Sequence, residues 1–113
     1  MNIKPLATEF SQKGFQLQQI VRDGQFAIFN RFQKFPEKGH FEVVVIQSHN
    51  GRKIGETYLE PAEFYPSDSQ WGQYGWTFTP GMSGSREQAF LDATKKFDEL
   101  IAAAEEKQNQ LKK

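Results

Sequence analysis

The sequence predicts an α+β domain in which an antiparallel β-meander of about five to six strands carries one C-terminal helix packed on one face. Three observations lead to this class. Residues 41–46 are rich in β-branched side chains, which are typical of strands. The dipeptides Asp23-Gly24 and Asn50-Gly51 are typical of tight hairpin turns. From Phe90 onward, apolar residues recur at spacings of three and four, which is the period of an amphipathic helix.

The first half of the chain predicts four strands in succession. Residues 6–11 and 15–21 are expected to pair as a hairpin, because Gly14 between them can adopt a positive φ. Asp23-Gly24 then turns the chain into a third strand, residues 25–32. A loop follows, and the next strand, residues 41–46, is apolar on both faces beyond Glu42, which favours a place inside the sheet.

The second half predicts one more hairpin, a long loop and a last strand. Asn50-Gly51 is expected to fold a weaker strand, about residues 53–59, back onto residues 41–46. Residues 60–75 contain two prolines and two glycines and are expected to form a loop. Residues 76–79 alternate in polarity and predict a short final strand.

The closing segment predicts one long helix. Ser85 and Gln88 have the spacing of a capping box, in which the serine begins the helix. One apolar stripe follows and is expected to face the sheet; its members are Phe90, Ala93, Thr94, Phe97, Leu100, Ile101 and Ala104. Beyond it the chain is almost wholly polar. We therefore predict a single domain over residues 1–105 and a frayed or solvated tail over residues 106–113.

Composition narrows the function classes. The 113 residues carry 14 basic and 14 acidic side chains and no cysteine, so disulfides and cysteine chemistry are excluded. Charge is uneven, since residues 1–56 hold eight basic and five acidic side chains, a net of +3. No segment resembles a membrane span or a signal peptide, which predicts a cytoplasmic protein without a membrane partner. The oligomeric state is not predicted.

Residues with catalytic potential do not assemble into a known pattern. His40 and His49 flank one strand, about 30 Å apart if it is straight, and cannot share a metal. The acidic residues lack calcium-loop spacing, and no serine lies in a nucleophile elbow. The segment from Gly81 into the helix lacks the lysine of a phosphate loop. We therefore expect no metal, no cofactor and no catalytic residue, and a binding function instead of an enzymatic one.

The aromatic residues are the main candidates for binding. Residues 71–78 contain both tryptophans, Tyr74 and two glycines. Trp76 begins an alternating strand and is expected to be a structural anchor, whereas Trp71 lies in the loop and is expected to face a partner. Exposed aromatic residues are frequent at interface hot spots. The predicted protein-binding residues are Trp71, Tyr74, Tyr65 and Phe64.

Two arrangements of the remaining aromatic residues are open, because one helix covers only one face of the sheet. An open second face with aromatic and basic residues would suit single-stranded nucleic acid. The residues expected for this alternative function are Arg22, Arg31, Lys34, Phe35, Arg52 and Lys53. Otherwise residues 60–78 fold back and seal that face as a second small core.

Residues 63–78, Glu-Phe-Tyr-Pro-Ser-Asp-Ser-Gln-Trp-Gly-Gln-Tyr-Gly-Trp-Thr-Phe, resemble a motif of small uncharacterised phage and prophage proteins. The similarity extends to residues 41–46 and to the closing helix. It implies a virus-encoded accessory protein of the host cytoplasm that binds a host or phage protein, and it implies no activity. Residues 71–75 are also similar to the Trp-Gly-Arg motif of the DNA-binding WGR domain, but Gln73 stands in place of the arginine.

Overall fold

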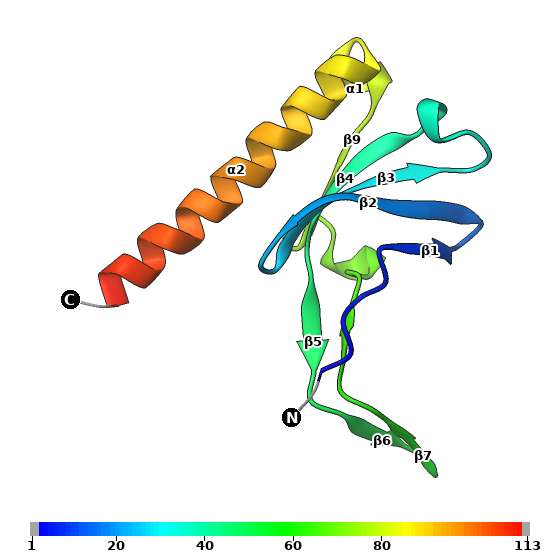
Figure 1. Ribbon diagram of the computed structural model, residues 1–113, viewed down its shortest axis with the longest axis vertical. Helices are drawn as coiled ribbons and strands as arrows, with labels where there is room; N and C mark the ends of the chain where they lie inside the picture. The colour runs from blue at the N-terminus through cyan, green and yellow to red at the C-terminus, as the bar shows by residue number, and fades with distance from the viewer. Residues whose placement is uncertain (1–2, 112–113) are drawn as a thin grey trace.

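A computed structural model describes residues 3–111 and has the predicted α+β class. Within these residues, one antiparallel sheet of five strands has the order β1-β2-β3-β4-β9 (Figure 1). Its strands are β1 (Glu9–Gln12), β2 (Phe15–Asp23), β3 (Phe26–Phe32), β4 (His40–Val45) and β9 (Gly75–Phe78). The long helix α2 (Arg86–Leu111) crosses one face of this sheet. The predicted meander with one helix on one face is confirmed.

Two tight turns set the register of the first three strands. In the β1–β2 hairpin, Lys13 and Gly14 both have positive φ, 55° and 82°, as a two-residue turn of type I′ requires. In the β2–β3 hairpin, Asp23 pairs with Phe26, so the turn residues are Gly24 and Gln25, one position later than predicted. Before this turn, β2 has a bulge at Ile20, since the register shifts between Gln19 and Val21.

The predicted hairpin at Asn50-Gly51 is wrong. The strand after β4, β5 (Gln47–His49), pairs with β8 (Ala62–Phe64). Residues between them form a separate ribbon of β6 (Arg52–Ile54) and β7 (Thr57–Leu59), which turns at Gly55-Glu56. Gly55 supplies the positive φ of 61° that this turn needs, while Gly51, at φ 92°, only redirects the chain into the ribbon. The expected single strand over residues 53–59 is thus a hairpin of its own.

Two short helical turns flank β9. The 3₁₀ turn η2 (Asp68–Gln70) lies before it and the helix α1 (Pro80–Ser83) after it; a further turn, η1 (Pro36–Lys38), lies between β3 and β4. The Thr79 hydroxyl accepts a hydrogen bond from the N–H of Met82 and so begins α1. Ser85 begins α2 in the predicted way, since its hydroxyl accepts from the N–H of Gln88 at 3.0 Å.

The first core lies between α2 and the sheet. Its buried members are Ile28, Phe41, Val43, Ala89, Ala93 and Phe97, with Phe90, Leu100 and Ile101 packed against them. The predicted stripe therefore faces β4, and the Phe41 and Phe90 rings meet edge to face at 5.2 Å. The fully buried Ala89 and Ala93 let the helix approach the sheet closely.

The second core lies on the opposite face of the same strands, because neighbouring strand residues point to opposite sides. Its buried members are Leu17, Ala27, Phe29, Val44 and Ile46. Leu6 and Phe10 from the N-terminal segment and Tyr65 and Trp71 from the long connection pack over them. Of the two arrangements left open by the sequence, the structure therefore has the sealed one.

Two segments project from this body (Figure 1). The radius of gyration is 15.7 Å, against about 13 Å for a compact chain of this length. The β6–β7 ribbon extends on one side and the C-terminal part of α2 on another. The helix continues past the predicted boundary at 105, and residues 105–109 are exposed. Residues 112 and 113 of the expected tail lie outside the described residues.

Phe97→Ala is expected to lower the free energy of unfolding by about 3–5 kcal/mol, because Phe97 is buried in the first core. Urea melts of the two proteins measure the difference. The exposed Leu91→Ala on the same helix serves as control and should change little. A loss below about 1 kcal/mol for Phe97→Ala would contradict the packing of α2 on the sheet.

Candidate functional site

The two tryptophans seal opposite faces of the sheet. Trp71 is half-buried against the second core, and its indole N–H donates to the Thr77 hydroxyl at 2.9 Å. The ring lies so close to Gly75 that a Cβ there would come within 2.5 Å of it. Trp76 packs on the first core, with the Lys96 ammonium 4.3 Å from its ring centroid. The loop thus folds the Trp71 ring inward onto the second core, and a partner-facing role for this half-buried residue stays a prediction.

The other predicted protein-binding residues do not form one open surface with Trp71. Tyr65 lies edge to face against Phe10 at 5.6 Å and Phe29 at 5.3 Å. Phe64 is half-buried in β8, where it pairs with Gln47 of β5. Tyr74 is also half-buried, and its carbonyl accepts from Val45 N–H at 2.8 Å.

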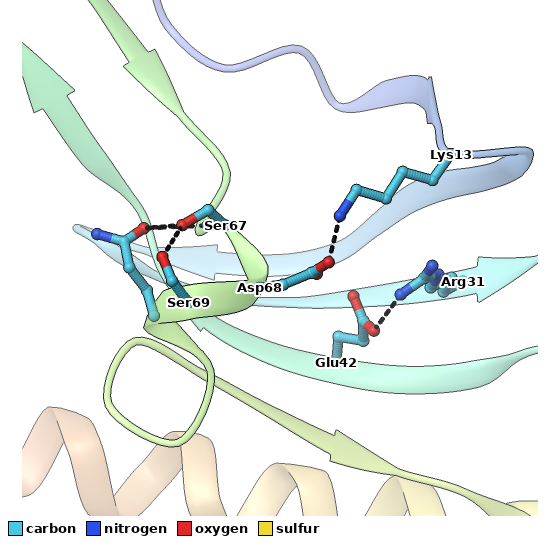
Figure 2. A network of polar contacts seen from close by, with 7 residues as sticks. Lys13, Arg31, Glu42, Ser67, Asp68 and Ser69 are labelled. Carbon is cyan, nitrogen blue, oxygen red and sulfur yellow. Dashed lines mark hydrogen bonds and ion pairs between the residues drawn. The ribbon is translucent and has the colours of Figure 1, made fainter.

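Beneath Tyr65, a buried carboxylate joins three segments of the chain. Glu42 of β4 is only 1% exposed. Its Oε2 accepts from Arg31 Nη1 of β3 at 3.0 Å, and its Oε1 accepts from the Tyr65 hydroxyl at 2.5 Å. His40 Nε2 lies 3.5 Å from Oε2. Figure 2 shows the Arg31–Glu42 pair on two neighbouring strands, below the turn that carries Asp68.

Burial and hydrogen bonding shift the pKa values of Glu42 and Tyr65 in this cluster. Burial alone would raise the pKa of Glu42, but hydrogen bonds from His40, Tyr65 and Arg31 outweigh it and hold that pKa below the usual range. Burial, and next the charge of Glu42, raise the pKa of the Tyr65 phenol. At neutral pH the cluster therefore holds a carboxylate and a neutral phenol, and neither group is set to exchange a proton near pH 7.

A hollow of about 220 Å³ opens beside this cluster, where β2 begins and β3 ends, and we call it the basic pocket. It is lined by Phe15, Arg31, Phe32, Gln33, Lys34, Phe35, Lys38 and His40. No acidic side chain of the described residues is among them. Its residues therefore offer aromatic faces and positive charge together.

Cations lie over the aromatic rings of this pocket. The Arg31 guanidinium is 4.1 Å from the centroid of Phe15. Phe35 is 46% exposed, and the ammonium groups of Lys34 and Lys38 lie 5.4 and 5.7 Å from its centroid. Such distances permit cation–π attraction. The exposed Phe35 ring thus lies close to two lysines that solvent can reach.

Side chains of β3 and α2 hold the loop that carries Phe35 through hydrogen bonds to its carbonyls. Buried Asn30 donates its amide N–H to the Pro36 carbonyl at 2.9 Å. Arg86 at the start of α2 donates to the carbonyls of Pro36 and Gly39 at 3.0 and 3.2 Å. A Cβ on Gly39 would lie 2.3 Å from the Asn30 side chain, so only glycine fits there. The pocket is therefore built on both the sheet and the helix.

The structure brings together three of the six residues predicted for nucleic acid: Arg31, Lys34 and Phe35. Arg22 lies elsewhere, in a two-pronged ion pair with Glu63 at 2.9 and 2.6 Å. Arg52 and Lys53 belong to the projecting ribbon.

Five lining residues were not among those predicted to bind nucleic acid: Phe15, Phe32, Gln33, Lys38 and His40. A signal for two of them exists in the hairpin register, since Gln16 pairs with Phe32 and so places Phe15 beside the loop after β3.

A second, more apolar hollow of about 770 Å³ lies between the beginning of α2 and strands β2 to β4. Its lining includes Ile20, Phe41, Phe90 and Leu91, and we call it the helix groove. Ile20 and Leu91 are 42% and 54% exposed. The bulge in β2 accounts for the exposed Ile20, because the extra residue leaves the pleat of the strand.

Comparison with protein-family models, curated proteins and solved structures finds no match to this chain. The resemblance to phage and prophage proteins therefore stays a prediction. Among residues 3–111, no helix is long and apolar enough to cross a membrane. The proposals below consequently rest on the geometry of this chain.

Trp71→Ala is expected to destabilise the fold by about 3 kcal/mol, the lower end for a truncated tryptophan, because the ring packs on the second core. Thr77→Val, which removes only the hydroxyl that accepts from the indole, should cost about 1 kcal/mol. Thermal and urea melts check both values. If Trp71→Ala melts like the wild type, the ring is not a plug of this core.

Glu42→Gln is expected to cost about 1.5–3 kcal/mol at pH 7, because charged hydrogen bonds are lost. Since folding lowers the pKa of Glu42, its contribution is complete above the unfolded pKa of about 4.3 and is lost as the pH falls through the folded pKa. As the pH is lowered from about 5 to 3, the free energy of unfolding should therefore fall less for Glu42→Gln than for the wild type. Urea melts across this range, with Glu56→Gln as an exposed control, measure it; parallel curves for Glu42→Gln and wild type would contradict the assignment.

Proposed function

We propose that the protein is a non-enzymatic binding module whose basic pocket holds single-stranded nucleic acid. The observation that carries this proposal is Phe35, an exposed ring whose centroid lies 5.4 and 5.7 Å from the ammonium groups of Lys34 and Lys38. Arg31 and His40 line the same pocket. Single strands are held by aromatic faces that stack on bases and by cations that contact phosphates. The alternative function expected from the sequence thus becomes the leading one, at the end of the sheet instead of on an open face.

The fixed loop supports the same proposal. Because Asn30 and Arg86 hold the loop through its carbonyls, Phe35 loses little conformational freedom when a base stacks on it. The net charge of zero does not oppose such binding, since no acidic side chain of the described residues lines the pocket and Glu42, which pairs with Arg31 beside it, is buried. The resemblance to phage proteins adds a setting, an accessory protein of the host cytoplasm, which is part of the proposal.

Phe35→Ala is expected to weaken binding of a fluorescein-labelled oligothymidylate of about 15 nucleotides by about 1–3 kcal/mol, whereas Phe35→Trp should retain it. Replacing Lys34 or Lys38 by Gln should lower the slope of log affinity against log salt by about 0.7 each. Fluorescence anisotropy at several salt concentrations measures both effects. Lys107→Gln, far along α2, is the matched control and should leave affinity and slope unchanged.

Binding that does not depend on salt, or equal affinity of Phe35→Ala and wild type, would contradict the proposal. Competition with unlabelled duplex of the same length adds a second criterion. A duplex buries its base faces, so it should compete less well than a single strand.

A protein partner is the second candidate, and the helix groove favours it. Exposed Ile20 and Leu91 flank this hollow, and apolar patches of this kind mark contact surfaces. Affinity capture from host lysate, with wild type and Leu91→Glu as paired baits, would test it. A protein retained by the wild type and lost with Leu91→Glu supports this role; identical captures oppose it.

A further inference from the structure

Asp68 is an exposed carboxylate held in a fixed position. It is the first residue of η2. Gln70 Oε1 accepts from the Ser67 N–H at 3.0 Å, and the Gln70 N–H donates to the Ser67 carbonyl at 3.0 Å, so that these two residues close the turn. The amide of Gln70 also donates to Gln47 Oε1 at 3.0 Å, which fastens the turn to β5. The Asp68 side chain is 84% exposed and pairs with the ammonium of Lys13, which reaches across from the β1–β2 turn (Figure 2).

The cations near Asp68 adjoin the basic pocket. Lys13 lies two residues before Phe15, which lines that pocket. Arg31 lines the basic pocket and also a neighbouring hollow of about 270 Å³ shared with Asp68, Glu42, Trp71 and Thr77. The Lys13 hydrogen bond and charge, and to a smaller extent the charge of Arg31, lower the pKa of Asp68. Asp68 therefore lies near two cations, Lys13 and Arg31, and Arg31 belongs to both hollows.

We propose that Asp68 occupies the place of a phosphate, and that a bound single strand displaces it from Lys13. Lys13 then becomes a further phosphate contact, which extends the binding surface from the basic pocket to the β1–β2 turn. Carboxylate and phosphate oxygens both accept hydrogen bonds from an ammonium group. Exposed ion pairs are weak, so the exchange requires no change of fold. This inference rests on the proposed function, and in it the Asp68 carboxylate competes with the phosphates of the bound strand for Lys13.

The experiment compares wild type, Asp68→Asn, Lys13→Gln and the double variant in the oligothymidylate titration. Asp68→Asn should bind about two- to fivefold more tightly, the range that corresponds to one exposed ion pair. Lys13→Gln should bind more weakly, with a salt slope lower by about 0.7. In the Lys13→Gln background the gain from Asp68→Asn should largely disappear. Asp98→Asn on the exposed side of α2 controls for the loss of one negative charge.

The outcomes separate the two proposals. If the wild type binds with salt dependence but Asp68→Asn binds no more tightly than Asp98→Asn, the displacement is wrong and the proposed function stands. A gain that persists in full without Lys13 would likewise overturn the displacement. If neither wild type nor Asp68→Asn binds the oligonucleotide, both proposals fall.

Discussion

The buried carboxylate of Glu42 is the interaction on which the arrangement of this protein depends. A charge with 1% exposure is tolerated only if its oxygens are fully hydrogen-bonded. Glu42 meets this requirement with Arg31 from the neighbouring strand and Tyr65 from the long connection, while His40 lies near. A single side chain of β4 thereby fixes the connection over the sheet and the guanidinium at the edge of the basic pocket.

Because both faces of the sheet are covered, the exposed aromatic and basic side chains of the basic pocket lie at the end of the sheet. The helix covers one face, and Tyr65 and Trp71 cover the other, so the described strands leave no broad aromatic surface for stacking. Loops at strand ends carry function in many folds, because a rigid scaffold positions them. Here the loop after β3 has that place, with Phe35 exposed and its backbone held by Asn30 and Arg86.

Local signals predicted the fold better than the site. The β-branched run at residues 41–46 and the stripe around Phe97 have periods that depend only on the sequence nearby, and both predictions are confirmed. Asn50-Gly51 carried a strong hairpin signal, but the hairpin turn of this segment lies five residues later, at Gly55-Glu56. The inward position of Trp71 depends on Gly75 and Thr77, contacts that exist only once the loop has folded back.

The same limit applies to the basic pocket. Arg31, Lys34 and Phe35 are close in sequence and were expected together, whereas Phe15 joins them only through strand pairing. Arg22 had the same sequence signal as Arg31, yet its partner Glu63 lies 41 residues away and takes it out of the site. Residue type predicted the candidates, and strand pairing together with the Arg22–Glu63 ion pair decided which of them meet at the pocket.

The most direct test of this account is a map of backbone amide chemical shifts while a single-stranded oligonucleotide is added to the ¹⁵N-labelled protein. Because the proposed binding surface lies at one end of the sheet, shift changes should concentrate at the β1–β2 turn and at residues 31–40. The C-terminal part of α2 and the β6–β7 ribbon should change little. Shifts centred on residues 71–74 or on the ribbon, or none at saturating oligonucleotide, would contradict the account.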